Sequence, residues 1–453
     1  MSDGTTPTRA TGRNRDTETQ VGEAKQAALR LANVDASTRN EALEAIADAL
    51  RAEKEAILAA NDDDLTEAEQ LLADGEYTQA LVDRLKLDAG KVESIAGMVE
   101  SVAGQADPLG RTLSARRLDV GLDLYKVSVP IGVVGTIFES RPDALVQIAA
   151  LALKSGNAVI LKGGSEASES NRVLYRTIVD AVDGIEEIPD GWAQLIEAHE
   201  AVDRVLEMDD AVDLLMPRGS SEFVSYVEDN TQIPVLGHTE GVCHVYVDAA
   251  ADLGMAGDVA LDAKVQYPAV CNAVETLLVH EAVAGEFLPG MVERYGEAGV
   301  TLRGDEATRE VVDIDPATEA DWSTEYGDLE LSIAVVEDVY DAIDHVNTHG
   351  SKHTEAILTE DEERARTFMQ SVDAASVFHN ASTRFADGYR YGLGAEVGIS
   401  TGKIHARGPV GLEGLTTYKY YLEGEGQQVA TYAGDDAREF LHEEFDGEWA
   451  PGE

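Results

Sequence analysis

The sequence predicts an α/β protein built on parallel sheets, and three observations lead to that prediction. The chain has 453 residues, 44% of them hydrophobic, which is enough for two or three domains with buried cores. Between residues 131 and 380, short apolar runs typical of buried strands alternate with amphipathic segments typical of helices. Glycine-rich or charged turns follow several of the apolar runs. Such alternation indicates βα units and a parallel sheet.

Within this region each predicted strand precedes a helix. The strand IGVVGTIF leads into PDALVQIAALALKSG, a helix that opens at Pro142 and closes at Gly156. The same order recurs in NAVILKGG with ESNRVLYRTIVDAV, and in VDLLMPRGSSEFVSYVED. A second block of strands begins near Val242 with VCHVYVD, VETLLVH, IAVVED, EAILTED and ASVFHN.

The flanking segments have other patterns. Residues 1–20 are polar and are expected to be disordered, whereas apolar residues recur at helical spacing over residues 21–104. Alternation in LSARRLDVGLDLYKVSVP (113–130) predicts a β-hairpin. The last coherent strand is GLTTYKYYLEG (414–424), and the acidic residues 433–453 are expected to form a loose tail.

The charge excludes several classes of function. Asp and Glu total 86 against 35 Lys and Arg, a net charge of −51, and the acids are spread along the whole chain. A nucleic-acid partner is disfavoured, because phosphate contacts need a basic face. We interpret the acidity as adaptation to a salt-rich cytoplasm, where high ionic strength screens the self-repulsion. It therefore concerns the solvent and not the chemistry.

The same sequence predicts a cytoplasmic protein that does not enter membranes. No run approaches the ~20 apolar residues of a membrane span, and the polar N-terminus MSDGTTPTRATGRNRD is not a secretory signal. The two cysteines cannot form a disulfide framework, so a reducing compartment is expected. Cys271, in QYPAVCNAVETLLV, is then either a small buried hydrophobic residue or a nucleophile.

Three motifs are weak candidates. GLGAEVG has the wrong spacing for a dinucleotide fingerprint, and GISTGKI is one residue short of a phosphate loop, with Ile404 where a hydroxyl would bind magnesium. His345, His349 and His353 are four residues apart, but Gly350 interrupts the helix and no carboxylate or cysteine completes a set. These histidines are expected to lie at a solvated helix end, and no metal site is predicted.

Four segments place glycine or charge where a predicted strand ends. They are IFESRPD, LKGGSEASE, MPRGSSE and the long run HNASTRFADGYRYGLGAEVGISTGKIHARGPVGLEGLTTYKY. Ligands of open α/β sheets bind at the carboxyl ends of strands, so LKGG and MPRGS are candidates for a dinucleotide's adenosine and pyrophosphate. The residues alone thus predict a nucleotide-binding enzyme with a candidate cysteine nucleophile, without naming its reaction.

VPIGVVGTIFESRPD, LKSGNAVILKGG, QYPAVCNAVETLL and the C-terminal run ASTRFADG to GLTTYKY closely resemble the gamma-glutamyl phosphate reductases, also called glutamate-5-semialdehyde dehydrogenases. That family is a branch of the aldehyde dehydrogenase superfamily. The resemblance extends over about residues 21–432. It implies NADPH-dependent reduction of L-glutamyl 5-phosphate to L-glutamate 5-semialdehyde with release of phosphate, the second step from glutamate to proline.

The resemblance also implies the architecture, an aldehyde dehydrogenase-like fold with two Rossmann-like parallel-sheet domains and a small β oligomerisation arm. The expected boundaries are 21–111 and 131–241 for the cofactor domain, 242–400 for the catalytic domain, and 112–130 with 415–432 for the arm. A homodimer or homotetramer follows, because edge strands of an arm seldom stay unpaired. Glutamate 5-kinase is a possible source of the substrate.

The resemblance also implies roles for individual residues at the positions where the motifs match. Cys271 falls on the catalytic cysteine, while Cys243 lies in a strand pattern and is expected to pack. The implied cofactor residues are Lys162 on the adenosine ribose side, the weaker candidates Ser165 and Glu166, then Gly219 and Ser220 near the pyrophosphate, and Glu325 at the nicotinamide ribose. Candidates for the substrate's phosphate, carboxylate and amine are Arg141, Arg218, Asn380, Ser382, Arg384 and Arg407, since Arg clamps oxyanions bidentately. A structural role for each Arg, and NADH in place of NADPH, stay open.

The implied chemistry is a Cys271 thioester that hydride reduces. Aldehyde-oxidising relatives carry a glutamate about 34 residues before the cysteine to activate water; counting back reaches Gly237 and His238, although Glu240 is close. A reductase should lack that base, because hydrolysis would waste the thioester. An aldehyde oxidiser and an inactive binding protein are the rival interpretations, and the presence of Cys271 disfavours the second.

Overall fold

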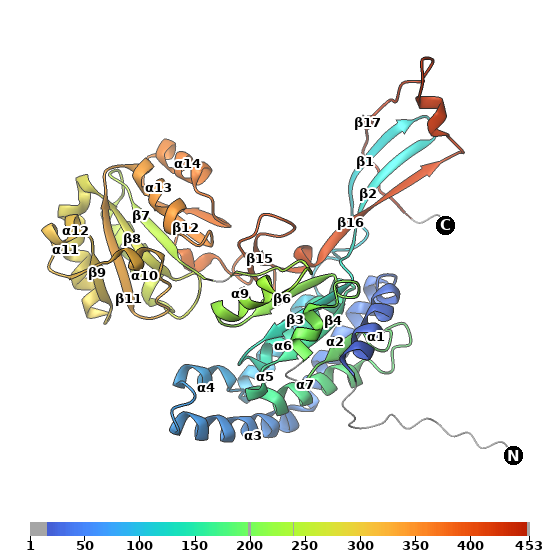
Figure 1. Ribbon diagram of the computed structural model, residues 1–453, viewed down its shortest axis with the longest axis horizontal. Coiled ribbons are helices and arrows are strands. Elements are labelled where there is room, and N and C mark those ends of the chain that lie inside the picture. The colour runs from blue at the N-terminus through green and yellow to red at the C-terminus, as the bar shows by residue number, and fades with distance from the viewer. Residues whose placement is uncertain (1–15, 198–200, 239, 451–453) are drawn as a thin grey trace. The chain divides into compact units, whose positions relative to one another are not determined.

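Two separate parallel sheets, one in each of two units, organise the chain (Figure 1). The computed structural model describes residues 16–197, 201–238 and 240–450. The first unit comprises Met1–Leu215, Asn230–Pro234 and Thr416–Glu453, and the second comprises Met216–Asp229 and Val235–Leu415. This division differs from the expected boundary at residue 241. The predicted α/β class with parallel sheets is confirmed.

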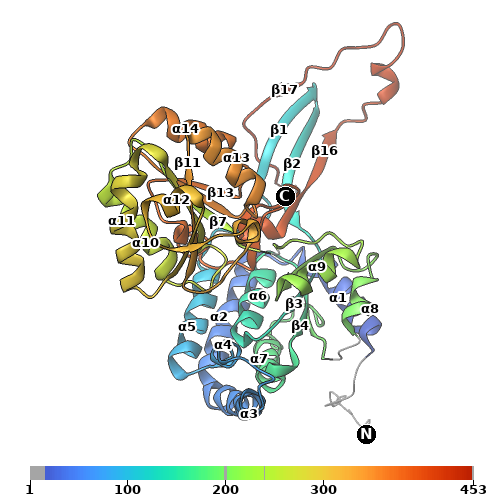
Figure 2. The same cartoon turned by 60° about the vertical axis from the view of Figure 1, so that its left-hand side comes forward.

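A four-stranded sheet has the order β5-β4-β3-β6. Strands β3, β4 and β5 lie in the first unit and are parallel, whereas β6 begins in the first unit and ends in the second. Every residue of β3 and β4 is buried, as their unbroken apolar runs predict. Figure 2 shows α6 and α7 beside this sheet. The strands are β3 (Val133–Phe138), β4 (Ala158–Gly163), β5 (Ala193–Leu195) and β6 (Leu214–Arg218).

The helices of this unit begin earlier than expected. Helix α1 starts at Thr17, so the predicted disorder of residues 1–20 is wrong from there on, while residues 1–15 lie outside the described part. Val21, Ala24, Ala28 and Leu31 form its buried face. The helices are α1 (Thr17–Leu31), α2 (Ala36–Ala52), α3 (Lys54–Ala73), α4 (Gln79–Leu85), α5 (Ala89–Ala103), α6 (Pro142–Lys154), α7 (Ser168–Ala181) and α8 (Ala201–Leu206).

An antiparallel sheet in the order β16-β2-β1-β17 forms the arm of this unit (Figures 1 and 2). Strands β1 (Thr112–Asp119) and β2 (Leu122–Pro130) form the hairpin, and β16 (Thr416–Gly424) pairs with the whole of β2. Residues 433–450 differ from the loose tail expected for 433–453. Strand β17 (Glu443–Glu444) pairs with β1, and the Trp449 ring stacks on Tyr421 at 4.0 Å between centroids.

The second unit has a seven-stranded sheet in the order β10-β9-β11-β8-β7-β12-β13, with every adjacent pair parallel. Alternate residues of β7 point to opposite faces: Val245 and Val247 pack with α10 and α11, whereas Tyr246 packs with α13 and α14. The strands are β7 (Cys243–Val247), β8 (Val274–His280), β9 (Thr301–Gly304), β10 (Asp315–Pro316), β11 (Glu330–Val336), β12 (Thr354–Leu358) and β13 (Ser376–His379).

Helices α10 and α11 pack on one face of the second unit's sheet and α13 and α14 on the other (Figure 1). The helices of this unit are α9 (Ser221–Asp229), α10 (Leu253–Val265), α11 (Glu281–Glu297), α12 (Glu306–Val311), α13 (Val339–His349) and α14 (Glu362–Ser371). A short ribbon of β14 (Gly398–Ser400) and β15 (Gly408–Val410) completes the unit.

The strand order has a consequence for the site. β8, β7 and β12 are consecutive in the sheet and parallel, so the residues that directly precede them meet at one edge, the amino edge. Those residues come from three segments far apart in the sequence.

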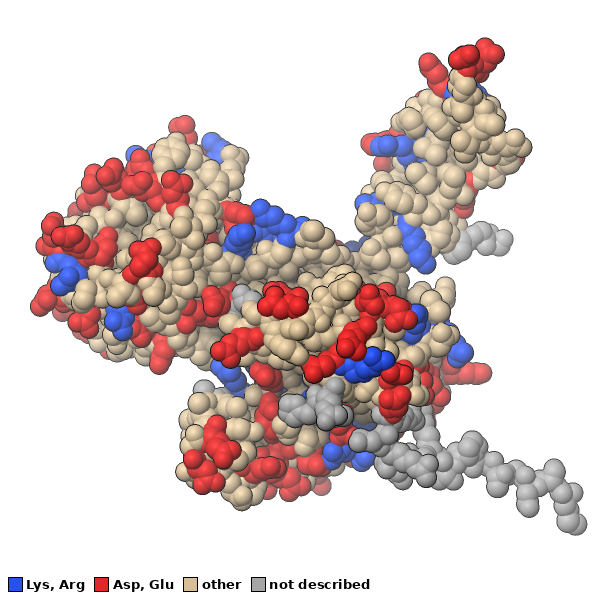
Figure 3. Space-filling model, in the orientation of Figure 1, with Lys and Arg blue, Asp and Glu red and all other residues tan. Residues whose placement is uncertain are grey.

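Acidic side chains are scattered over the visible face of both units and are not gathered in one patch (Figure 3). Among the residues that the structure describes, no helix is long and apolar enough to cross a membrane.

Candidate active site

Cys271 lies on the loop between α10 and β8, at the amino edge of the second sheet. Its thiol is free and half-buried, whereas Cys243, the first residue of β7, is fully buried. Burial raises the pKa of the Cys243 thiol well above its usual value. Cys243 therefore stays protonated and inert, as its strand pattern predicts, while Cys271 is open to a substrate.

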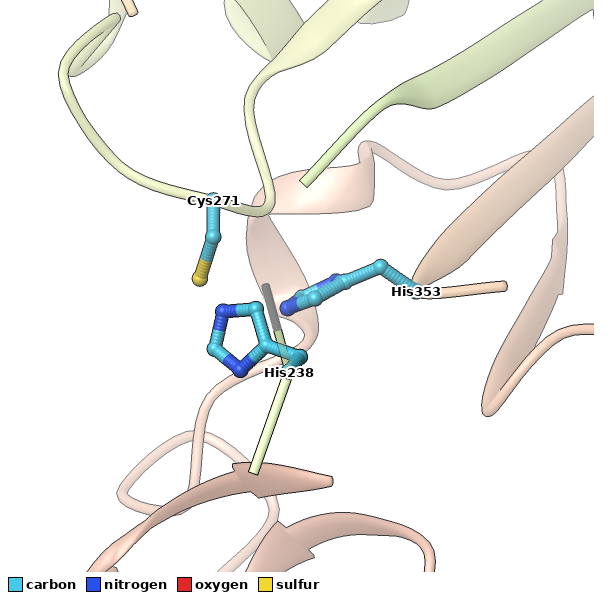
Figure 4. Close-up of side chains that lie close together, drawn as sticks. All are labelled: His238, Cys271 and His353. Carbon is cyan, nitrogen blue, oxygen red and sulfur yellow. The ribbon is translucent and has the colours of Figure 1, made fainter. Parts of the chain in front are cut away.

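Two histidines face the Cys271 thiol (Figure 4). His238 precedes β7 and His353 precedes β12. The Cys271 Sγ and one ring nitrogen of each histidine all lie within 4.8 Å of one another. The two rings are 5.0 Å apart between centroids, at 67°. Strand order alone brings these three residues together.

The ring nitrogens of the two histidines have different partners. His238 Nδ1 lies 2.8 Å from the Ile399 carbonyl oxygen, which only accepts, so Nδ1 donates and Nε2 is left as the acceptor beside the thiol. His353 Nδ1 lies 2.8 Å from the Thr354 hydroxyl. His353 Nε2 is buried and has no hydrogen-bond partner in the described structure.

The expectation of a solvated helix end for the three spaced histidines is wrong for two of them. His353 is fully buried, because it leads directly into the central strand β12. His345 lies on the face of α13 that packs on the sheet, and burial lowers its pKa to about 3. His349, at the end of α13, is partly exposed, with its Nδ1 3.3 Å from the Ser323 hydroxyl.

The backbone around Cys271 is closely packed. A Cβ on Gly241 would overlap the Cys271 backbone, so only glycine allows this approach. The Cys243 thiol donates to the Cys271 carbonyl oxygen at 3.2 Å. The Asn272 amide donates to the Ala386 carbonyl oxygen at 2.8 Å. Three contacts from other segments thus hold the thiol's loop.

A buried ion pair connects the two ends of this loop. Lys264 lies in the last turn of α10 and Glu275 is the second residue of β8. Their side chains are both fully buried and meet at 2.6 Å. Burial raises the pKa of Glu275 to about 7, although Lys264 opposes that rise. Glu275 also accepts from the Gly327 backbone N–H at 3.3 Å, which links the Cys271 loop to the segment that carries Glu325.

Two of the predicted arginines lie in this neighbourhood. Arg384 is buried, and its Nε donates to Gln266 of the Cys271 loop at 3.0 Å. Burial lowers the pKa of the Arg384 guanidinium. A negative charge on Cys271 opposes this shift. Burial raises the pKa of the half-buried Glu396, and Arg218 and His238 are close enough to oppose that rise. The Glu396 carboxylate accepts from the Gly388 N–H at 2.8 Å.

The other substrate candidates have structural partners. Asn380 accepts from and donates to the Thr359 backbone, at the carboxyl end of β12 and thus at the edge opposite Cys271. Ser382 accepts from the Arg384 N–H at 3.3 Å. Arg407 forms an ion pair with Asp373 at 3.0 Å. Arg141, in the first unit, is exposed at the start of α6.

The cofactor candidates of the first unit surround the end of β4. A pocket there is lined by the apolar residues Ile137, Ile160, Ile196, Ala201, Val202 and Val205 together with Gly135, Thr136 and Lys162. The Lys162 ammonium donates to the Gly163 carbonyl oxygen at 2.7 Å, and the buried Thr136 hydroxyl has no partner in the described structure. Ser165 is exposed, and Glu166 accepts from the Ser140 N–H and hydroxyl.

Gly219, Ser220 and Glu325 belong to the second unit. Gly219 and Ser220 are exposed between β6 and α9, where Ser220 Oγ accepts from the Phe223 N–H at 3.3 Å. This strand–turn–helix places backbone N–H groups at a helix N-terminus, which suits a phosphate. Glu325 is half-buried and close enough to Glu275 to raise its pKa.

Sequence reasoning missed His238 as a partner of the thiol, and with it His353 and Gly241. Counting back from Cys271 had reached His238, but only to note the absence of a glutamate. The usable signal is that HTEGVC and GSKH immediately precede neighbouring strands.

Comparison with known proteins identifies the family. A model of the aldehyde dehydrogenase family matches residues 4–321, more than half of the chain. The gamma-glutamyl phosphate reductase of Natronomonas pharaonis is 70% identical over 437 residues, which is 96% of this chain and 99% of that protein. The chain belongs to the aldehyde dehydrogenase family, in its gamma-glutamyl phosphate reductase branch.

Two further comparisons agree. The gamma-glutamyl phosphate reductase of Haloquadratum walsbyi is 68% identical over 440 residues, covering 95% of this chain and 96% of that protein. The crystal structure of gamma-glutamyl phosphate reductase from Thermotoga maritima has a TM-score of 0.88 at 42% identity, covering 91% of this chain and 99% of that one. The predicted resemblance and the aldehyde dehydrogenase-like fold are confirmed.

Gly241→Ala should displace the Cys271 loop without unfolding the unit. Because a displacement of about 1 Å at a reacting group costs roughly 100-fold in rate, alkylation of Cys271 by iodoacetamide should slow by about that factor. The matched control is Gly237→Ala, since a Cβ there meets only Pro217, at 3.7 Å or more. Equal alkylation rates in the two variants would show that the close approach at Gly241 does not position the thiol.

Lys264→Met should destabilise the protein more as pH rises. The variant leaves Glu275 buried without its cation, so its folded pKa, already raised above 4.5, rises further. The folded state then keeps a proton that the unfolded chain releases, and stability falls as pH increases through this range. The free energy of unfolding from denaturant titration should drop by about 3–5 kcal/mol at pH 8 and by much less at pH 5.5.

The control for this measurement is Lys86→Met, which breaks an exposed ion pair with Asp83 and should show no comparable pH dependence. The double variant Lys264→Met, Glu275→Gln should also lose the pH dependence. A Lys264→Met penalty that is equal at pH 5.5 and pH 8 would contradict the explanation.

Proposed function

We propose that this chain reduces L-glutamyl 5-phosphate to L-glutamate 5-semialdehyde with release of phosphate, through a thioester on Cys271. The reaction is that of the reductase branch to which the chain belongs, the second step from glutamate to proline. The observation that carries the residue assignment is the half-buried Cys271 thiol facing an imidazole whose free nitrogen is an acceptor.

In this proposal His238 Nε2 takes the proton of the Cys271 thiol, because the thiolate and not the thiol is the nucleophile. The thiolate attacks the acyl carbon, the bond to the phosphate oxygen breaks, and the proton held by His238 leaves on the phosphate. Arg384, a buried cation beside the loop, stabilises the thiolate. The oxyanion that forms at each addition accepts from the Cys271 backbone N–H.

A nicotinamide cofactor, when bound, would supply the hydride that reduces the thioester to a thiohemiacetal. Collapse of the thiohemiacetal breaks the carbon–sulfur bond, releases the aldehyde and returns the thiolate. His238 stands where aldehyde-oxidising relatives are expected to carry a water-activating glutamate, and it faces the sulfur. The glutamate expected of an aldehyde oxidiser is absent from that position, which disfavours the aldehyde-oxidiser alternative.

We propose Arg384 and Arg218 as the main substrate-binding residues, because both lie in the neighbourhood of Cys271 and His238. Each guanidinium offers a planar pair of donors to a phosphate or a carboxylate. Arg141 and Ser382 remain candidates. Asn380 and Arg407 are better explained as structural residues, since Thr359 and Asp373 already engage them.

The first unit holds candidates for the adenosine end of the cofactor. Enzymes of the aldehyde dehydrogenase family use NAD(P), and we propose NADPH for this chain. The lining of the pocket along β3 and β4 is apolar, as an adenine prefers, and the Thr136 hydroxyl, which has no partner among the described residues, and the Lys162 ammonium offer polar groups for the ribose side. We further propose that the turn of Gly219 and Ser220 holds the pyrophosphate, and that Glu325 holds the nicotinamide ribose, with Ser165 and Glu166 in secondary roles.

The arm supports an oligomer. β16 is an edge strand of the arm sheet, and Tyr418, Tyr420 and Leu422 are exposed on it. Unpaired edges of this kind invite pairing with a second chain, so we propose a homodimer or homotetramer. We also propose a cytoplasmic setting, and delivery of the unstable acyl phosphate by glutamate 5-kinase.

Cys271→Ser should abolish catalysis. A hydroxyl is a far weaker nucleophile at neutral pH, so phosphate-dependent reduction of NADP⁺ by glutamate 5-semialdehyde, assayed at high salt, should fall about 10⁴-fold or more. Cys243→Ser is the control for a general effect of losing a thiol, and should keep most of the rate. Full activity in Cys271→Ser would refute the nucleophile assignment, and aldehyde oxidation to an acid without phosphate would refute the reductase assignment.

Lys162→Gln should weaken cofactor binding selectively. If the ammonium contacts the 2′-phosphate, the KM for NADPH should rise about tenfold, which is about 1.4 kcal/mol, while the KM for NADH changes little. Lys91→Gln, at an ion pair with Asp143 elsewhere in the first unit, is the control. Equal losses with both cofactors would place Lys162 on a group that the two share.

A further inference from the structure

We propose that His238, Cys271 and His353 together form a binding site for a soft divalent cation, with Zn²⁺ as the representative ion. The site offers one thiol and two imidazoles, from the segments that precede β8, β7 and β12. Their ligand atoms all lie within 4.8 Å of one another. The binding claim rests on this geometry and does not depend on the reaction assigned to the chain.

The ligand types and distances suit zinc. Thiolate sulfur and imidazole nitrogen are its usual protein ligands, at about 2.3 Å and about 2.0–2.1 Å. Tetrahedral geometry at those lengths separates neighbouring ligand atoms by roughly 3.5 Å. Cys271 and His238 are only half-buried, so small rotations of their side chains close the remaining gap.

A second observation points to a ligand independently of the cluster. His353 is fully buried, and its Nε2 has no hydrogen-bond partner in the described structure. Leaving a buried polar nitrogen without a hydrogen-bond partner costs free energy, so a partner is expected there. Figure 4 shows the end of this ring directed at the space beside the thiol and His238. A cation in that space would satisfy it.

The surroundings orient the ligands as in known zinc sites. His238 Nδ1 is held by the Ile399 carbonyl and His353 Nδ1 by the Thr354 hydroxyl. The carbonyl fixes the tautomer of His238, and both outer partners fix the orientation of the rings. Because Cys271 and His238 are half-exposed, a water molecule can take the fourth position, which makes the ion exchangeable.

The consequence for activity rests on the proposed function. A thiolate that coordinates zinc is not available to attack the acyl phosphate, and His238 cannot then accept its proton. Bound Zn²⁺ therefore inhibits the reductase reversibly, and a chelator restores it. The net charge of −51 raises the local concentration of cations near the protein, to an extent that falls with salt.

Direct binding tests the site. The full chain, reduced with a phosphine and freed of metal with EDTA, is titrated with Zn²⁺ by calorimetry and with Co²⁺ by absorption at constant high KCl. We expect one ion per chain and a thiolate-to-cobalt charge-transfer band. Cys271→Ser should remove that band, and His353→Gln should weaken Zn²⁺ binding at least about tenfold. His349→Gln, at the end of the neighbouring helix, is the matched control and should bind as the wild type does.

Two outcomes would overturn the site: no stoichiometric binding, or equal binding by the wild type and Cys271→Ser. If His353→Gln does not fold, Zn²⁺ binding by His238→Gln and the cobalt absorption band of the variants that do fold test the site instead. Activity is measured separately. Inhibition by Zn²⁺ over the concentration range of binding, reversed by EDTA, supports regulation, whereas binding without inhibition overturns it. A metal-free enzyme that binds Zn²⁺ but never reduces the substrate would refute the proposed function and leave the site standing.

Discussion

The parallel alignment of β8, β7 and β12 is the constraint on which the rest of this site depends. In a parallel sheet all strands begin at the same edge, so the residues before three neighbouring strands must meet. Cys271, His238 and His353 are those residues. The sheet itself is held by apolar packing on both faces, and the positions of the thiol and the imidazoles follow from it.

The loop that carries Cys271 is positioned by buried polar contacts. Burying such groups costs free energy, and the contacts form only over a narrow range of distances and angles. The Lys264–Glu275 pair holds its two ends, and the Cys243 thiol and the Asn272 amide hold its middle. A buried pair of this kind contributes little net stability, because desolvation offsets the attraction. We infer that its contribution is positional, since it also reaches the backbone of the segment that carries Glu325.

Charges on the acidic surface are screened by water and salt, whereas charges at the candidate active site are screened much less. Carboxylates dominate the exposed face, where water and salt screen them, whereas Arg384 and Lys264 are buried beside the Cys271 loop. In the drier interior a single cation acts on the thiolate far more strongly than the distant surface charge does. The chain can therefore adapt its surface to its solvent without changing the electrostatics at the sulfur.

The sequence by itself determined the α/β class, the order of strands and helices, the family and the burial of Cys243 in a strand, and it predicted Cys271 as the nucleophile. These properties depend on local periodicity and on contiguous motifs such as QYPAVCNAVETLLV, which need no knowledge of distant contacts. It failed for the segment after residue 432 and for the buried histidines, because β17 and His353 owe their surroundings to segments more than 100 residues away. Only the tertiary structure decided that His238 and His353 face the thiol and that Asn380 lies at the opposite edge. The reason is physical: strand order sets which loops are neighbours, and strand order is a property of the packed sheet.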